Sequence, residues 1–111
     1  ITLSLPDGLH VNSFRPLSEY SIPTTVRLSA TKGVKVYGPT YPRGKTKTFQ
    51  FSKNPINVYE GVVNFPFTFI VPTNYTGKTV TVRAVVRYQA CTDSICYPPK
   101  TQTVLITARV K

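Results

Sequence analysis

The 111-residue chain combines a strong positive charge with an ordinary share of apolar residues. It has fourteen basic and four acidic residues, a formal net charge of +10 and 41% hydrophobic residues. A chain of this length can bury a core of its own, and no stretch approaches the roughly 18 consecutive apolar residues of a membrane-spanning helix. The charge permits binding to nucleic acid, an anionic membrane or an acidic protein, although basic side chains that only decorate the solvent faces of strands are the simpler explanation.

Alternation of apolar and polar residues dominates the chain, and nothing in it predicts a long helix. The sequence predicts strands at residues 1–5, 9–14, 22–30, 34–37, 48–51, 62–71, 79–89 and 101–110. About seven to nine short strands with turns every 8–12 residues indicate an all-β antiparallel sandwich. Because there is no internal repeat, linker or low-complexity tract, we expect residues 1–111 to form one domain.

The sequence predicts opposite environments for two stretches in the middle of the chain, one exposed to solvent and one in the core. Residues 38–45 contain two prolines and two glycines, which predict an exposed loop, and its basic residues include Arg43 and Lys45. Residues 62–71 carry the heaviest apolar stripe, and its members are expected to line one face of a strand and to lie in the core: Val63, Phe65, Phe67, Phe69 and Val71.

Both cysteines, Cys91 and Cys96, lie in one short segment between two predicted strands. A hairpin at this place can bring the two Cα atoms into the range of about 4.4–6.8 Å that a disulfide requires. In the chain-entropy model a ring of about six residues contributes only about 2 kcal/mol, against about 4 kcal/mol for a ring of roughly sixty. The short ring is therefore a poor stabilising cross-link, and a redox-active pair and a static bridge that shapes one loop both stay open. A cysteine pair without neighbouring histidine or further cysteine favours an oxidising compartment over a metal site, so no metal or cofactor is expected.

The residues that flank the cysteines resemble the signature of a known family. The segment that ends at Cys91 reads VRYQAC, and the segment that begins at Cys96 reads CYPPKT. These segments are similar to the V-x-Y-Q-x-C and C-Y-P-P-x-T pattern of the amino-terminal periplasmic domain of the thiol:disulfide interchange protein DsbD. A weaker match is the run from Val58 to Gly61. Family members have one residue more between the cysteines than the four of this chain.

The resemblance implies an immunoglobulin-like β-sandwich with thiol:disulfide oxidoreductase activity. Such a domain is periplasmic, is tethered to the inner membrane, and takes electrons from a thioredoxin-like domain of the same polypeptide. It passes them to thioredoxin-like proteins of periplasmic disulfide isomerisation and cytochrome c biogenesis; no nucleic acid is expected as a partner. The second cysteine of the family makes the intermolecular bond, which assigns that role to Cys96 and the resolving role to Cys91.

The same resemblance implies a protective loop and a docking surface. The family covers its disulfide with a cap loop that carries a phenylalanine, which here falls at residues 49–54 with Phe51 as the best match. The alternative is that Phe49 and Phe51 belong to the core of an edge strand. The residues expected to contact a partner are Phe51 of this loop and four residues that flank the cysteines or lie between them, for which packing and turn formation are the other possible roles: Tyr88, Asp93, Tyr97 and Pro98.

No residue close to the cysteines in the sequence is clearly placed to activate a thiolate. Arg87 and Lys100 are basic neighbours, and the strand geometry decides whether either points toward the cysteines. There is no CxxC motif at a helix start, and Asp93 opposes negative charge. His10 is the chain's only histidine, and a lone histidine in a strand is more often a surface or edge residue than a catalyst. We therefore expect an ordinary thiol that becomes reactive on docking to a partner.

Two other functions remain open on the sequence. One is a non-catalytic β-sandwich that acts as a binding module and carries a static disulfide. The other is a basic protein that binds nucleic acid or a membrane surface. The second lacks the interleaved basic and aromatic residues that single-stranded nucleic acid requires on a binding sheet.

Overall fold

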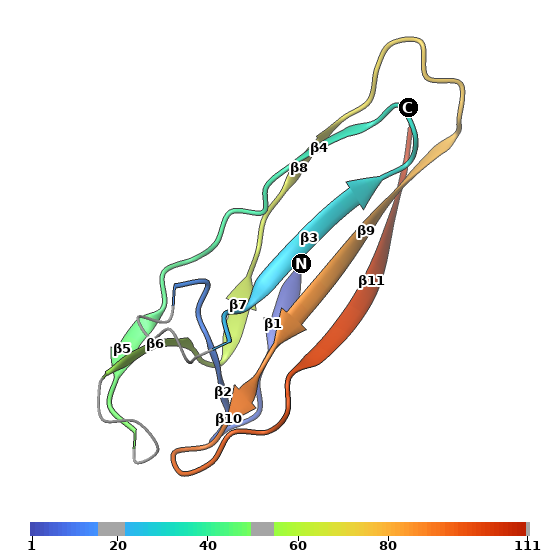
Figure 1. The fold of residues 1–111 in the computed structure, drawn as a ribbon. Helices are drawn as coiled ribbons and strands as arrows, with labels where there is room; N and C mark the ends of the chain where they lie inside the picture. The colour runs from blue at the N-terminus through green and yellow to red at the C-terminus, as the bar shows by residue number, and fades with distance from the viewer. Residues whose placement is uncertain (16–21, 50–54, 111) are drawn as a thin grey trace.

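The computed structural model describes residues 1–15, 22–49 and 55–110, and the described residues form strands and turns without a helix (Figure 1). Every strand pair is antiparallel. The strands are β1 (Thr2–Ser4), β2 (His10–Asn12), β3 (Thr25–Ala30), β4 (Lys35–Tyr37), β5 (Lys45–Lys47), β6 (Ile56–Tyr59), β7 (Val62–Asn64), β8 (Thr68–Ile70), β9 (Thr79–Tyr88), β10 (Ala90–Cys91) and β11 (Lys100–Arg109). The predicted fold class, an all-β immunoglobulin-like antiparallel sandwich, is confirmed.

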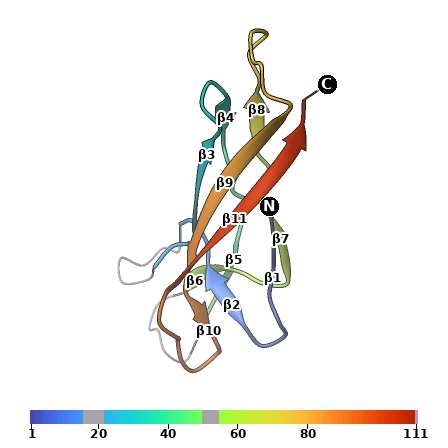
Figure 2. The same cartoon turned by 90° about the vertical axis from the view of Figure 1, so that its right-hand side faces the viewer.

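The longest strands form a three-stranded sheet in the order β11-β9-β3. The remaining strands form a four-stranded sheet, β10-β2-β6-β5, and two separate pairs, β1-β7 and β4-β8. Figures 1 and 2 show the β11-β9-β3 sheet running diagonally along the molecule, with β10 and β2 at its lower end. The pairing between β9 and β11 is unbroken from Tyr88↔Lys100 to Thr79↔Arg109.

The core lies under the alternating face of β9. Val80, Val82, Ala84 and Val86 are buried, while the residues between them face outward or are half-buried. Ala84 and Val86 are buried in one cluster with Val26 of the same sheet and with residues from the other strand pairs and sheets: Val11, Tyr59, Val63 and Phe65. Burial of β-branched side chains on one face of a strand is the main stabilising contribution here.

The apolar stripe at residues 62–71 does not form the single core strand that the sequence predicts. The chain is divided into β7, which pairs with β1, and β8, which pairs with β4. Pro66 lies in the break, and proline cannot donate a hydrogen bond to a neighbouring strand. Phe65 is fully buried, whereas Phe67 and Phe69 are only half-buried.

The segment at residues 38–45 is only partly the exposed loop that its composition predicts. Tyr41 turns inward, where its hydroxyl accepts a hydrogen bond from the Val26 N–H at 2.9 Å, and its ring stacks on Phe14 at 4.9 Å between centroids. The strand expected at residues 48–51 lies earlier, at Lys45–Lys47. The Tyr41 ring is large and apolar, and its hydroxyl is hydrogen-bonded to the backbone of Val26. Packing of this ring against the core therefore holds part of the segment inward, although its prolines and glycines favour an exposed loop.

Candidate redox site

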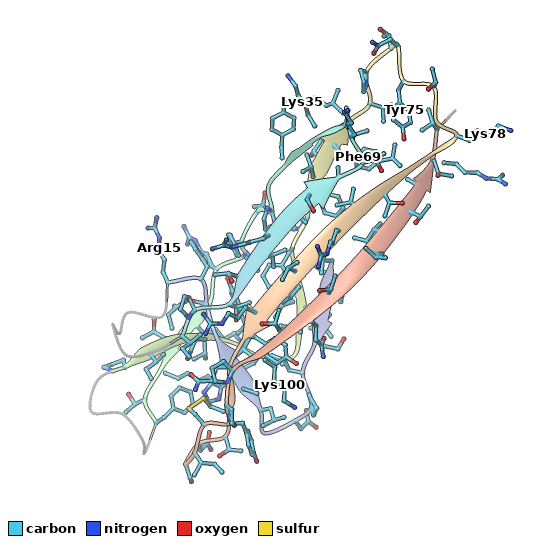
Figure 3. All side chains as sticks on the ribbon, turned by 45° about the vertical axis from the view of Figure 1, so that its right-hand side comes forward. Arg15, Lys35, Phe69, Tyr75, Lys78 and Lys100 are labelled. Carbon is cyan, nitrogen blue, oxygen red and sulfur yellow. A yellow bond between two sulfur atoms is a disulfide. The ribbon has the colours of Figure 1, made fainter. Side chains whose placement is uncertain are left out.

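The two cysteines form a disulfide at one end of the sandwich. Their Cα atoms are 4.0 Å apart, and the yellow sulfur bond lies at the lower end of the molecule in Figure 3. The predicted hairpin of β9 and β11 is confirmed, with one difference. Between these strands, Ala90 and Cys91 leave the sheet and pair with Val11 and His10 of β2. The disulfide therefore joins the hairpin loop to the second sheet.

Thr92 organises the turn between the cysteines. Its backbone N–H donates to the Ile95 carbonyl at 2.8 Å. Its side-chain oxygen accepts hydrogen bonds from the backbone N–H groups of Ser94 and Ile95 at 3.2 and 3.1 Å. These side-chain-to-backbone hydrogen bonds stabilise a tight turn. Four residues are therefore enough to connect Cys91 with Cys96, which pair as an antiparallel bridge.

The two sulfur-bearing residues differ sharply in exposure. Cys91 is completely buried because β2 covers the short strand in which it lies. Cys96 is exposed, since it follows the turn and has no neighbouring strand except the short bridge to Cys91. Of the two cysteines, only Cys96 is thus exposed to solvent.

Of the residues predicted to contact a partner, Tyr88, Tyr97 and Pro98 meet at one cavity, Asp93 does not line it, and Phe51 lies outside the described residues. Tyr88, Tyr97 and Pro98 line an apolar cavity of about 440 Å³ whose other wall includes Leu3 and Leu5 of the β1 segment. Tyr97 is held in place because its backbone N–H donates to the Ala90 carbonyl at 2.9 Å. The structure thus brings Tyr88, Tyr97 and Pro98 together at one cavity. Their role in docking a partner stays a prediction.

The expectation that His10 is a surface or edge residue is wrong. His10 is 2% exposed, and its strand lies between β10 and β6, so it is neither a surface residue nor on an edge. It stands directly across from Cys91, and its ring stacks on Phe49 with 4.2 Å between centroids and 18° between planes. The pairing of β2 with β10 joins distant parts of the chain, and no local sequence signal indicates it.

A second, polar cavity of about 390 Å³ has His10 among its lining residues. Its lining includes Lys45, Glu60 and Asp93, and Asp7 and Gly8 form part of the exposed rim. Burial lowers the pKa of His10 below its usual value of 6.5. The carboxylates of Glu60 and Asp93 raise this pKa, and the ammonium group of Lys47 lowers it further, but burial is the largest of these effects. The imidazole is therefore held in its neutral form at neutral pH.

The cap-loop prediction falls partly outside the described residues. Phe51 lies among residues 50–54, which the structure does not describe. Phe49 is 7% exposed and packs in a cluster with Ile56 and Val58 as well as on His10.

In the described segments, no group of three or more His, Cys, Asp or Glu side chains is placed to hold a metal ion. None of the described residues belongs to a helix that is long and apolar enough to cross a bilayer.

Comparison with known proteins gives two matches. Residues 2–108 match the family described as the N-terminal domain of the thiol:disulfide interchange protein DsbD. A thiol:disulfide interchange protein DsbD from Pseudoalteromonas atlantica is 28% identical over 81 residues, which cover 72% of this chain. The match covers only 13% of that relative's length.

Proposed function

Because the chain belongs to the family of N-terminal domains of the thiol:disulfide interchange protein DsbD, we propose that it transfers electrons between proteins through the Cys91–Cys96 pair. It takes them from a thioredoxin-like domain of its own polypeptide and passes them to oxidised thioredoxin-like proteins of disulfide isomerisation and cytochrome c maturation. The proposed location is the periplasm, with the domain tethered to the inner membrane. In this role the domain is a thiol:disulfide oxidoreductase.

The observation that carries the proposal is the unequal exposure of the two cysteines. The reduced pair acts on an oxidised partner in two steps. The Cys96 thiolate attacks the partner's disulfide, and one partner sulfur leaves as a thiolate while the other stays bonded to Cys96. Cys91 then attacks Cys96, the internal disulfide forms, and the second partner sulfur leaves with the electron pair. Complete burial of Cys91 and exposure of Cys96 suit this division of roles.

The surroundings of Cys96 suit docking by another protein. The lining of the apolar cavity includes Tyr97 and Pro98, which directly follow Cys96 in the chain, and buried aromatic side chains contribute much of the binding energy in protein interfaces. Tyr97 is 45% exposed and Ile95 is 54% exposed. Both can lose contact with water when a partner approaches.

Single-cysteine variants test the assignment of roles. We expect Cys91→Ser to accumulate a mixed disulfide with a thioredoxin-like domain whose single cysteine is first converted to a mixed disulfide with thionitrobenzoate. The Cys96 thiolate displaces thionitrobenzoate as the leaving thiolate, and the resolving thiol that would break the new bond is gone. Cys96→Ser should form the complex at least about tenfold more slowly, since its remaining thiol is buried. The wild-type reduced domain should form the complex only transiently. Non-reducing electrophoresis and mass spectrometry of the intact complex measure all three.

The same experiment separates the proposal from a static binding module. Both variants should remain folded by circular dichroism, because the short ring contributes only about 2 kcal/mol. A static disulfide predicts no complex in either variant, and it predicts that a reduced thioredoxin-like domain leaves the wild-type bridge intact. A complex that forms through Cys91 alone would keep the function and reverse the two roles.

A further inference from the structure

We propose that His10 accepts the proton of the Cys91 thiol and connects this buried group to the polar cavity at the surface. The inference rests on the proposed exchange function and concerns its second step, in which Cys91 must ionise before it attacks Cys96. A thiol that is completely buried has a raised pKa, because burial disfavours the charged thiolate. The domain therefore needs a nearby group that takes the proton.

The strand register places an imidazole beside the resolving sulfur. His10 is the direct cross-strand neighbour of Cys91, and Cys91 is the direct neighbour of Cys96. Directly opposite residues of antiparallel strands point to the same face, with Cβ atoms about 4.5–5.5 Å apart. The imidazole and the two sulfurs thus form one row across three neighbouring segments.

The environment of His10 suits a proton acceptor. Phe49 covers one face of the ring, and the residue is 2% exposed, so the imidazole is neutral and ready to accept a proton at neutral pH. The charged groups around it are Glu60 and Asp93, which favour the imidazolium, and Lys47, which disfavours it. Lys45 and Asp7 line the same cavity. Two carboxylates therefore stabilise the charge that proton transfer creates.

The step balances in protons and electrons. The Cys91 Sγ–H bond breaks and the proton moves to the imidazole. The Cys91 thiolate then attacks Cys96 Sγ, the Cys91–Cys96 bond forms, and the bond from Cys96 to the partner sulfur breaks. The partner sulfur leaves with the electron pair and is reduced, while the two cysteines are oxidised. The imidazolium releases its proton to the departing thiolate or, through the polar cavity, to solvent.

The pH dependence of the resolving step tests the role of His10. The probe is oxidised glutathione, which reacts with the reduced domain to give a glutathione mixed disulfide at Cys96. The lifetime of this intermediate is measured by acid quench and mass spectrometry from pH 5 to 9. We expect the wild-type rate to level off above the pKa of His10, which lies below 6.5. The rate should then stay constant up to about pH 8.5, where free thiols ionise.

The variant His10→Gln keeps a polar side chain and removes the titrating group. Its rate should be about 100-fold lower at pH 7, should rise about tenfold per pH unit, and should approach the wild-type rate above about pH 9. Phe49→Leu is the matched control, since it removes the stacked ring and keeps the imidazole, so its plateau should persist. A His10→Gln profile that keeps the wild-type shape, even at a lower rate, would overturn the inference.

A second measurement needs no substitution of His10. The chain has one histidine, so its ring resonances report the titration of this site without assignment. In the reduced protein the His10 signal should show a second inflection when Cys91 ionises, and this inflection should be absent in the oxidised protein and in Cys91→Ser. Identical titrations in all three would rule out the coupling. Failure of Cys91→Ser to form a mixed disulfide with the thioredoxin-like domain would overturn the proposed function, whereas an unchanged pH profile in His10→Gln would overturn the role of His10 alone.

Discussion

Two cysteines that share one short loop have different environments, and the difference arises from single contacts. Cys91 lies in a strand that pairs with β2, whereas Cys96 follows the turn that Thr92 stabilises. The pairing also brings His10 beside Cys91. At the residue scale, the site is therefore asymmetric: Cys96 is exposed to solvent, and Cys91 is buried directly across from His10.

The charges around His10 give a prediction with a definite sign. Glu60 raises the pKa of His10 and Lys47 lowers it, and the two side chains are paired at 2.8 Å. Glu60→Gln should move the midpoint of the His10 titration to lower pH, because a negative charge that favours the imidazolium is removed. Lys47→Met should move it to higher pH. Nuclear magnetic resonance of the single histidine measures both; shifts of the same sign would contradict this account.

At the scale of elements, β9 and β11 present the disulfide loop, and β2 and β6 support it from the second sheet. The support depends on the close approach of the segment before β5 to β6. A Cβ at Gly44 would lie 2.8 Å from the Val58 carbonyl oxygen and 2.9 Å from the Ser13 Cβ, and it would also meet the side chain of Asn57. No other residue type fits at this position without movement of the backbone.

Replacement of Gly44 should therefore destabilise the domain more than replacement of a turn glycine. We expect Gly44→Ala to lower the free energy of unfolding by about 3 kcal/mol, because the methyl group overlaps backbone and side-chain atoms. Gly33→Ala is the control: a Cβ there meets nothing within 4 Å, and the cost is the strain of φ +91°, about 1 kcal/mol. Urea unfolding of both variants measures the difference, and an equal or smaller loss at Gly44 would refute the crowding argument.

At the scale of the whole molecule, the protein is elongated, with extents of 55 × 21 × 19 Å. The disulfide lies near Lys100 at one end, and Tyr75 and Lys78 lie at the other (Figure 3). A partner that docks on Cys96 therefore approaches one end of the sandwich. The outer face of the β11-β9-β3 sheet is left free, and its basic residues are Arg27, Arg83, Arg87 and Arg109.

This basic face should not bind nucleic acid tightly. None of the described residues that share the face with these arginines on β3, β9 and β11 is aromatic, and stacking on aromatic side chains supplies much of the affinity for single strands. We expect binding of a single-stranded oligonucleotide only at low salt, with a steep loss as the salt concentration rises. Fluorescence anisotropy in physiological salt measures this. Micromolar or tighter binding there would make the arginine face functional.

The sequence by itself determined the fold class, the alternating core face of β9 and the hairpin that carries the cysteines. These features depend on local patterns: the two-residue period of a strand, the turn residues, and the short distance between Cys91 and Cys96. The family motif around the cysteines also lies within one continuous segment. Such local features depend only on residues that are close in the sequence, so the sequence pattern predicts them.

Only the tertiary structure decided which residues of the other strands reach the site. The place of His10 beside Cys91 depends on the pairing of two strands that lie far apart in the chain. The apolar stripe at residues 62–71 is divided because the partner strand changes at Pro66, from β1 to β4. The burial of Tyr41 likewise depends on a hydrogen bond to Val26. Long-range pairing is selected by the packing of the whole sandwich, so no local pattern predicts it.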